Sequence, residues 1–185
     1  DESGRLRRLQ ASDKYLAYLM NYYDTLYLRD INTFELKKKI NINMNELINN
    51  FDNMYENLAL EEYIIQKNSN YALAMYEFRK IGGNDYFNIL VAIDLHNDNY
   101  KIIYNNTNYY NNDWDILNLQ LSNDGNKLYA VRYYSINPGE TLLGFYEWDL
   151  SNDFERKELN INITSDDFSF TNHNYKVSPN TSSLF

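Results

Sequence analysis

Three segments of the sequence repeat one another, and this internal similarity restricts the fold more than any other feature of the chain. They span residues 9–18, 65–74 and 119–130. Each consists of a short apolar run, a polar turn that contains Ser with Asn or Asp, and a second run rich in apolar and aromatic residues. This pattern is typical of a β-hairpin and is clearest at Asp124-Gly125, because Gly readily adopts the positive φ that a tight turn requires. The repeat therefore predicts a chain built from β-hairpins.

A second repeated block follows each hairpin. An apolar strand ends in an aspartate, one aliphatic residue comes next, and a polar turn leads to a further strand. These last strands are expected at 35–40, 100–104 and 155–159, and the aspartates are Asp30, Asp94 and Asp149. Four strands per unit, repeated at this period, are typical of the blades of a β-propeller.

We therefore expect a single all-β region over 1–185 made of four-stranded antiparallel blades. Aligning the hairpins on Ala17, Ala74 and Ala130, which are 57 and then 56 residues apart, places the blades at about 6–41, 61–105 and 115–160, with a partial fourth at 166–185. Propellers typically carry 4–8 blades. The chain is thus expected to be part of a larger propeller, or to pair with another chain that completes the ring.

The repeated units resemble those of WD-repeat and related β-propeller proteins, whose third strand often ends in Trp-Asp. Trp148-Asp149 matches this dipeptide, whereas Arg29-Asp30 and Ile93-Asp94 keep only the aspartate. The Gly-His pair usual at the start of a WD repeat is missing from every unit, which favours a divergent propeller. The hairpin at 12–18 also looks like blades of the propeller domains in prolyl-oligopeptidase-type enzymes.

One segment departs from the β pattern. A helix is predicted over 45–58, because apolar residues recur there at helical spacing and because Asn43 with Glu46 three residues later resembles a capping box. The apolar residues are Leu47, Phe51, Met54 and Leu58. Apolar residues between Leu6 and Met20 also fit a helix, which leaves a single α+β domain as the alternative fold.

Composition excludes several classes of function. The chain has no Cys and only two histidines, His96 and His173, so a thiolate zinc site, a cysteine nucleophile and a multi-histidine metal site are not expected. A net charge of −9 argues against nucleic-acid binding. The longest apolar runs, such as 89–93, are too short to insert into a membrane. We expect a soluble protein without cofactor or metal, cytoplasmic rather than exported, although the compartment stays open.

The polar motifs are better explained as structure than as chemistry. Recurrence in successive units places Asp30, Asp94 and Asp149 in separate blades, where each side chain is expected to shape its own turn. Residues 123–126 and 111–115 only loosely resemble a calcium loop. No Gly-x-Ser-x-Gly motif is present, and Gly82-Gly83 lacks the rest of a phosphate loop. We expect no catalytic residue.

Aromatic residues are the remaining candidates for function. Those at or near predicted strand ends and loops are Tyr22, Tyr23, Tyr109, Tyr110, Trp114, Tyr133 and Tyr134. Tyr and Trp are effective recognition residues, although Tyr is also a common strand former. The sequence therefore favours a non-catalytic propeller module that binds a protein or peptide through its loop face. The alternatives are the propeller domain of a larger serine hydrolase and an acidic inhibitor or immunity-type protein that binds a basic partner.

Overall fold

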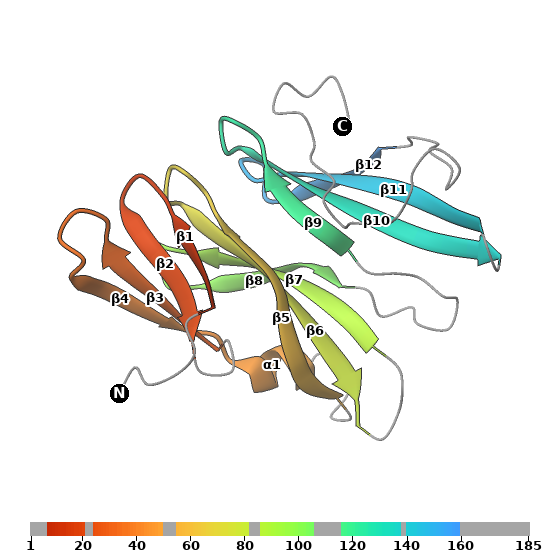
Figure 1. Cartoon of the computed structure of the whole chain (residues 1–185), viewed down its shortest axis with the longest axis horizontal. Helices are drawn as coiled ribbons and strands as arrows, with labels where there is room; N and C mark the ends of the chain where they lie inside the picture. Colours follow the sequence, from red (N-terminus) through yellow and green to blue (C-terminus); the bar gives the residue numbers. More distant parts are fainter. Residues whose placement is uncertain are drawn as a thin grey trace. The chain divides into compact units, whose positions relative to one another are not determined.

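Strands dominate the computed structural model, which describes residues 7–20, 24–49, 55–81, 86–105, 116–137 and 140–159. Within these ranges the chain forms twelve strands and one short helix. The strands make three separate four-stranded sheets (Figure 1). The predicted all-β fold of four-stranded antiparallel units is therefore confirmed, and the α+β alternative is wrong, because residues 7–11 and 15–20 form strands rather than a helix.

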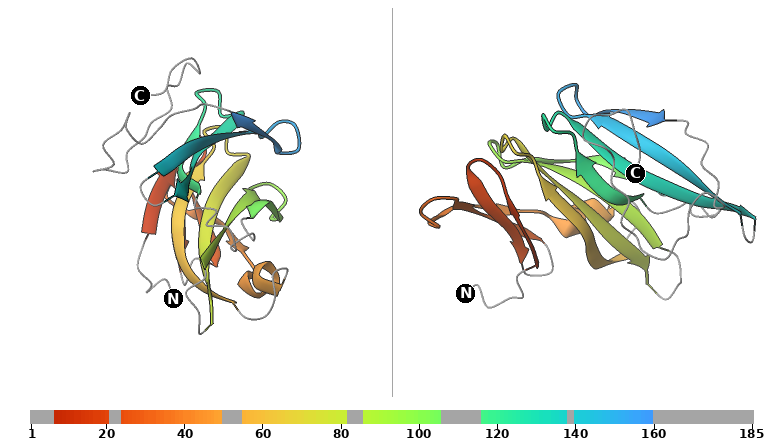
Figure 2. Two further views of the ribbon diagram at one scale, coloured as in Figure 1. Left: turned by 90° about the vertical axis from the view of Figure 1, so that its right-hand side faces the viewer. Right: turned by 45° about the horizontal axis from the view of Figure 1, so that its top comes forward.

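Each sheet is a meander in which strands adjacent in sequence are antiparallel neighbours in space. Sheet 1 contains β1 (Arg7–Ala11), β2 (Tyr15–Met20), β3 (Thr25–Asp30) and β4 (Leu36–Asn41). Sheet 2 contains β5 (Tyr55–Ile65), β6 (Tyr71–Lys80), β7 (Tyr86–Asp94) and β8 (Tyr100–Asn105). Sheet 3 contains β9 (Ile116–Leu121), β10 (Lys127–Asn137), β11 (Glu140–Asp149) and β12 (Glu155–Leu159). Figure 2 shows the twist of the longer strands within these sheets.

The chain divides into two compact units. The first, Asp1–Asn105, holds sheets 1 and 2, and the second, Asn106–Phe185, holds sheet 3. The partial fourth repeat predicted at 166–185 lies outside the described residues. No helix in the described ranges is long and apolar enough to span a bilayer.

Strand register corrects the alignment of the repeats. The aspartate that ends each third strand pairs with the first residue of the second strand, as Asp30 with Tyr15, Asp94 with Tyr71 and Asp149 with Lys127. Counted from these pairs, the residue equivalent to Ala74 and Ala130 is Tyr18, not Ala17. The error arises because the alignment matched alanine with alanine across a first hairpin turn that is two residues shorter than the others. It matters because a slip of one residue moves a side chain to the opposite face of a sheet.

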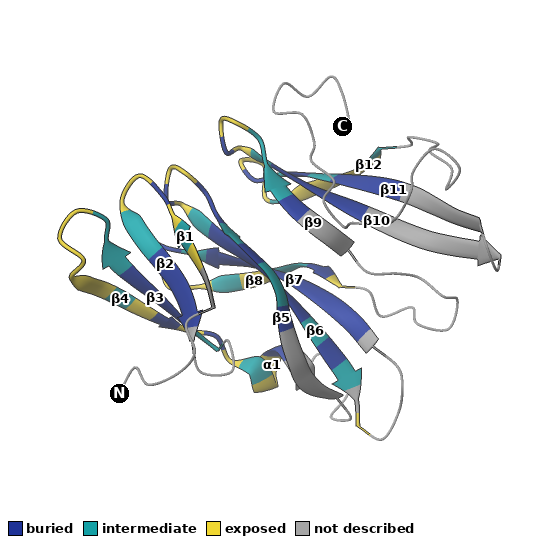
Figure 3. Ribbon diagram, in the orientation of Figure 1, coloured by how far each residue is buried: buried dark blue, intermediate teal, exposed yellow. Residues whose placement is uncertain are grey.

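The core of the first unit lies between sheets 1 and 2. On one face of sheet 1, Ala17, Leu19, Leu26 and Leu28 are all completely buried. Lys38 shares this face, because it pairs with Leu28, and its Nζ reaches the backbone of sheet 2. The first strands of the two sheets, β1 and β5, also lie against each other. Figure 3 shows the same pattern, with strand centres buried and turns exposed.

Helix α1 (Met44–Asn49) is shorter than the predicted helix. The predicted cap is present, since the Asn43 side chain accepts a hydrogen bond from the backbone N–H of Glu46 at 3.2 Å. The prediction is wrong for 55–58, because β5 begins at Tyr55 and pairs with β6. Leu58 therefore lies in a strand, and sheet 2 begins six residues earlier than the predicted blade. Pairing with a distant strand has outweighed the local helical spacing.

Candidate functional site

Two ends can be distinguished in every sheet. The turn between the first and second strands and the turn between the third and fourth strands lie at one end, which carries Asp30, Asp94 or Asp149 and which we call the aspartate end. The connection between the second and third strands lies at the opposite end. The first strand begins and the fourth strand ends at this end too. We call this opposite end the loop end.

The predicted binding residues fall in sequence at or near the loop ends. Tyr22 and Tyr23 lie between β2 and β3, and Tyr109, Tyr110 and Trp114 lie between β8 and β9, all outside the described residues. In β10, Tyr133 and Tyr134 pair along the backbone with Leu143 and Leu142, close to the connection to β11, and only their backbone is described. Their role in binding stays a prediction.

At the aspartate ends, the three carboxylates accept hydrogen bonds from the turns that follow them. Asp30 accepts from the backbone of Asn32 and Thr33 at 2.9 and 3.0 Å. Asp94 accepts from the backbone of His96 and Asn97 at 2.8 and 3.1 Å.

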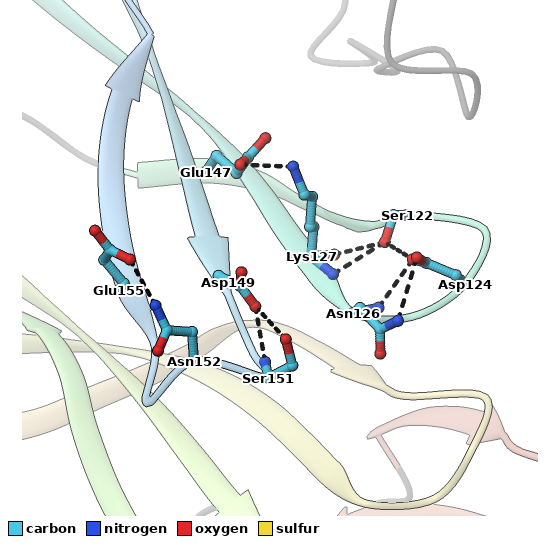
Figure 4. A network of polar contacts seen from close by, with 9 residues as sticks. All are labelled: Ser122, Asp124, Asn126, Lys127, Glu147, Asp149, Ser151, Asn152 and Glu155. Carbon is cyan, nitrogen blue, oxygen red and sulfur yellow. Dashed lines mark hydrogen bonds and ion pairs between the residues drawn. The ribbon is translucent and has the colours of Figure 1, made fainter.

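The third aspartate makes the corresponding contacts within sheet 3. Asp149 accepts from the backbone N–H and the hydroxyl of Ser151 at 2.9 and 2.6 Å (Figure 4). Each aspartate therefore organises its own turn, in the manner typical of an Asx turn.

These hydrogen bonds favour the ionised carboxylates. The backbone amides of Thr33 and Asn32 lower the pKa of Asp30 from its ordinary value. Partial burial acts to raise the pKa of Asp94, but the amides of His96 and Asn97 outweigh it and the net pKa is lowered. The hydroxyl and then the amide of Ser151 lower the pKa of Asp149. All three groups are thus anionic at neutral pH and act as hydrogen-bond acceptors, not as general acids.

The residue after each aspartate forms a second repeated contact that sequence reasoning did not identify. The backbone N–H groups of Ile31, Leu95 and Leu150 donate to the carbonyl oxygens just before the second strands, at 3.0, 3.0 and 2.8 Å. These bonds join the two turns of each aspartate end. The sequence signal was the aliphatic residue that follows each aspartate.

A third repeated contact closes the hairpin turn between the first and second strands. A side-chain oxygen of Ser12, Gln66 or Ser122 accepts a hydrogen bond from the first backbone N–H of the second strand at 3.0 Å in every sheet. The signal was a polar residue with an oxygen acceptor just after each first strand.

The loop at 123–126 is a hairpin turn. Asp124 accepts from the Ser122 hydroxyl at 2.5 Å and from the Asn126 backbone at 3.0 Å, and these bonds lower its pKa (Figure 4). Gly125 has φ +72°, the conformation for which glycine is favoured. The Asp124 carboxylate is therefore already used inside its own turn.

The other polar candidates do not form a chemical site within the described residues. His96 lies in the exposed turn after Asp94, with its Nε2 3.1 Å from Asn70 Oδ1. His173, Gly82-Gly83 and the segment 111–115 lie outside those residues. In the described ranges, no group of three or more His, Asp or Glu side chains is placed to hold a metal ion.

An exposed surface at the end of sheet 1 was not identified from the sequence. Phe34 and Leu36 are 61% and 39% exposed. The Arg29 side chain beside them donates to the Phe34 carbonyl at 3.0 Å and to the Tyr18 hydroxyl at 2.8 Å. The Lys39 ammonium lies 4.9 Å from the centre of the Tyr27 ring. Two apolar side chains are therefore presented to solvent beside Arg29, which lies 6.0 Å from the centre of the Tyr18 ring, and Lys39 lies on the Tyr27 ring further along β4.

Comparison with known proteins does not assign the chain to a family. No protein-family model matches it, and no curated protein matches it at a significant level. Among solved structures, a chain of hydrazine synthase from Kuenenia stuttgartiensis is similar with a TM-score of 0.37 and 9% sequence identity. The match covers 84% of this chain and 54% of that chain, so this chain spans about half the length of the matched one. A likeness of this size supports no conclusion about function.

Proposed function

We propose that the chain is a non-catalytic module of propeller-type blades that binds a protein or peptide through its loop ends. The proposal is supported by the difference between the two ends of each sheet. At the aspartate ends, the conspicuous polar side chains bond to their own turns and are committed to holding the fold. The loop ends carry the tyrosines and the tryptophan that the sequence places between strands.

A rigid sheet that carries variable connections at one end is well suited to recognition. Binding residues are concentrated on loops positioned by a stable scaffold, and Tyr and Trp provide large contact areas with few rotatable bonds. The three repeated sets of hydrogen bonds at the aspartate ends supply such a scaffold. The propeller resemblance adds that the partner is a second chain or the remainder of a longer one.

Selection of peptides against the purified chain tests this proposal. Peptides recovered from a random display library would be measured by fluorescence anisotropy against wild type and two double variants, Tyr22→Ser/Tyr23→Ser and Tyr109→Ser/Tyr110→Ser. At least one double variant should weaken binding by about tenfold or more, as expected for an aromatic hot spot. Tyr15→Ser at the aspartate end is the control, and thermal melting would verify that every variant folds.

Two outcomes would contradict the proposal. One is that no peptide binds, or that the selected peptides bind both double variants as tightly as wild type. The other is binding to a basic protein that disappears with added salt and does not depend on the tyrosines, which would favour the acidic-inhibitor alternative.

A further inference from the structure

Strand β4 forms an edge of sheet 1. It pairs with β3, and the strand order β1-β2-β3-β4 leaves its other side without a partner strand in the described part of the chain. Such an edge presents backbone N–H and C=O groups that can pair with another extended chain. The corresponding edges of sheets 2 and 3 are β8 and β12.

Apolar exposure is concentrated at this edge. Among the side chains whose burial the structure describes, four large hydrophobic ones are exposed. Two of them lie close together, Phe34 in the turn before β4 and Leu36 at its first position. Phe34 has φ +59°, whereas the equivalent position of sheet 2 is occupied by Asp98 at φ +60°. Asp tolerates this left-handed conformation far better than a bulky aromatic residue does. The turn before β12 also holds a Phe in this conformation, Phe154 at φ +61°, but that residue is only half-exposed. What distinguishes Phe34 is therefore its exposure of 61%.

Positive charge is concentrated at the same edge. β4 carries three consecutive lysines, whereas the four charged residues of β12 cancel and β8 carries a single lysine. Lys38 is directed to sheet 2, where its Nζ bonds to the carbonyl oxygens of Leu95 and His96 at 3.0 Å. Lys37 and Lys39 are exposed on either side of it. The Lys37 Nζ pairs with the exposed Glu35 carboxylate at 3.1 Å, and the Lys39 Nζ lies over the Tyr27 ring. Lys38 also pairs with Asp98, so two carboxylates face three lysines at this edge. In a chain with a net charge of −9, the edge therefore keeps a small local excess of positive charge.

We propose that the β4 edge binds an extended acidic peptide, which adds to sheet 1 as a fifth strand. Backbone hydrogen bonds to the free side of β4 hold the peptide. Its carboxylates lie beside Lys37 and Lys39, and an apolar side chain covers Phe34 and Leu36. Lysines on an edge strand also discourage aggregation, but that role does not explain two exposed apolar residues at the same edge.

This surface is separate from the loop ends, so it can be tested independently of the proposed function. The probe is a short fluorescein-labelled peptide with glutamates in one half and valines in the other, measured by anisotropy. Reversing charge with Lys37→Glu/Lys39→Glu should weaken binding by about tenfold or more. The matched control, Arg156→Glu/Lys157→Glu in β12, should bind as wild type does.

Two further measurements address the mode of binding. Phe34→Asn keeps a residue that tolerates positive φ and removes the ring, so it should weaken binding without unfolding the chain, as thermal melting would verify. A peptide N-methylated at alternate residues should lose binding, because it cannot donate to the strand edge. Loop-end variants such as Tyr22→Ser should bind the peptide as wild type does.

The proposal is overturned if the probe does not bind, if charge reversal in β4 and β12 has equal effects, or if N-methylation has none. A further outcome also overturns it. If sedimentation shows that the chain self-associates, that self-association prevents the probe from binding, and that Lys37→Glu/Lys39→Glu abolishes it, then the β4 edge binds a second copy of the chain.

Discussion

Replacing Tyr63 by Phe should stabilise the protein. Tyr63 lies in β5, its side chain is only 2% exposed, and its hydroxyl has no hydrogen-bond partner among the described residues. A buried polar group without a partner costs about 1–3 kcal/mol. Phe keeps the ring and removes the hydroxyl, so the free energy of unfolding of Tyr63→Phe should rise by about that amount.

The same substitution should change the response to alkaline pH. Burial raises the pKa of Tyr63 well above its ordinary value of 10.0. Below pH 10 the tyrosine is protonated in both the folded and the unfolded state, so its effect on stability does not change with pH. Above pH 10 the unfolded state releases the proton first, and the free energy of unfolding of the wild type falls. For one such group the free energy of unfolding falls by about 1.4 kcal/mol per pH unit. Tyr63→Phe lacks this ionisable hydroxyl, so the difference in free energy of unfolding between the variant and wild type should widen above pH 10.

Urea denaturation followed by circular dichroism at neutral pH and at several alkaline values measures both effects. Tyr15→Phe, which removes a hydroxyl from a half-buried ring in the same unit, is the matched control. The reasoning is refuted if Tyr63→Phe loses about 1 kcal/mol or more at neutral pH, the sign of a lost hydrogen bond. It is also refuted if wild type and Tyr63→Phe lose stability in parallel above pH 10.

Three further predictions concern the first unit. Ser69 Oγ donates to Ser12 Oγ at 2.7 Å between the sheets, and Ser12 makes further hydrogen bonds in its own turn. Ser12→Ala should therefore lower the free energy of unfolding by about 2–3 kcal/mol, and Ser69→Ala should lower it by about 1 kcal/mol. Urea denaturation of both single variants and of the double variant would measure these losses. Equal losses of stability in Ser12→Ala and Ser69→Ala would contradict the prediction. Lys38→Met removes the bonds to sheet 2 and should lower stability by about 1–2 kcal/mol, whereas Lys37→Met should leave the melting temperature unchanged. Because the pKa of Asp94 is lowered in the folded state, the stabilisation by its carboxylate is present above its ordinary pKa of 3.8 and is lost as the pH falls through the lowered pKa. Asp94→Asn should therefore be destabilising in neutral melts, and its deficit relative to wild type should shrink as the pH falls below 3.8.

The aspartate ends were the part of the fold most accessible from sequence. Their signals are local, because an Asx turn needs only an aspartate and the backbone two or three residues further on. Asp30 and Asp94 do bond to such groups. The strands expected at 35–40, 100–104 and 155–159 are within one residue of β4, β8 and β12 for the same reason.

Other features depended on contacts distant in sequence. Leu58 fits the helical spacing of its neighbours, yet it belongs to β5, whose ladder with β6 joins Tyr55 to Lys80. The hairpin turns differ in length, so the sequence alone does not show whether Ala17 or Tyr18 is equivalent to Ala74. The pairing of the second and third strands shows that it is Tyr18. Spacing along the chain does not reveal which strand lies opposite.

By itself, the sequence determined that the chain repeats a four-stranded antiparallel unit and that an aspartate ends each third strand. Those properties follow from alternation, turn residues and internal similarity, which are all short-range. Only the tertiary structure decided which side chains are exposed at β4. There Lys38 is drawn to sheet 2 while Phe34 and Leu36 face solvent, because burial depends on the packing of one sheet against another.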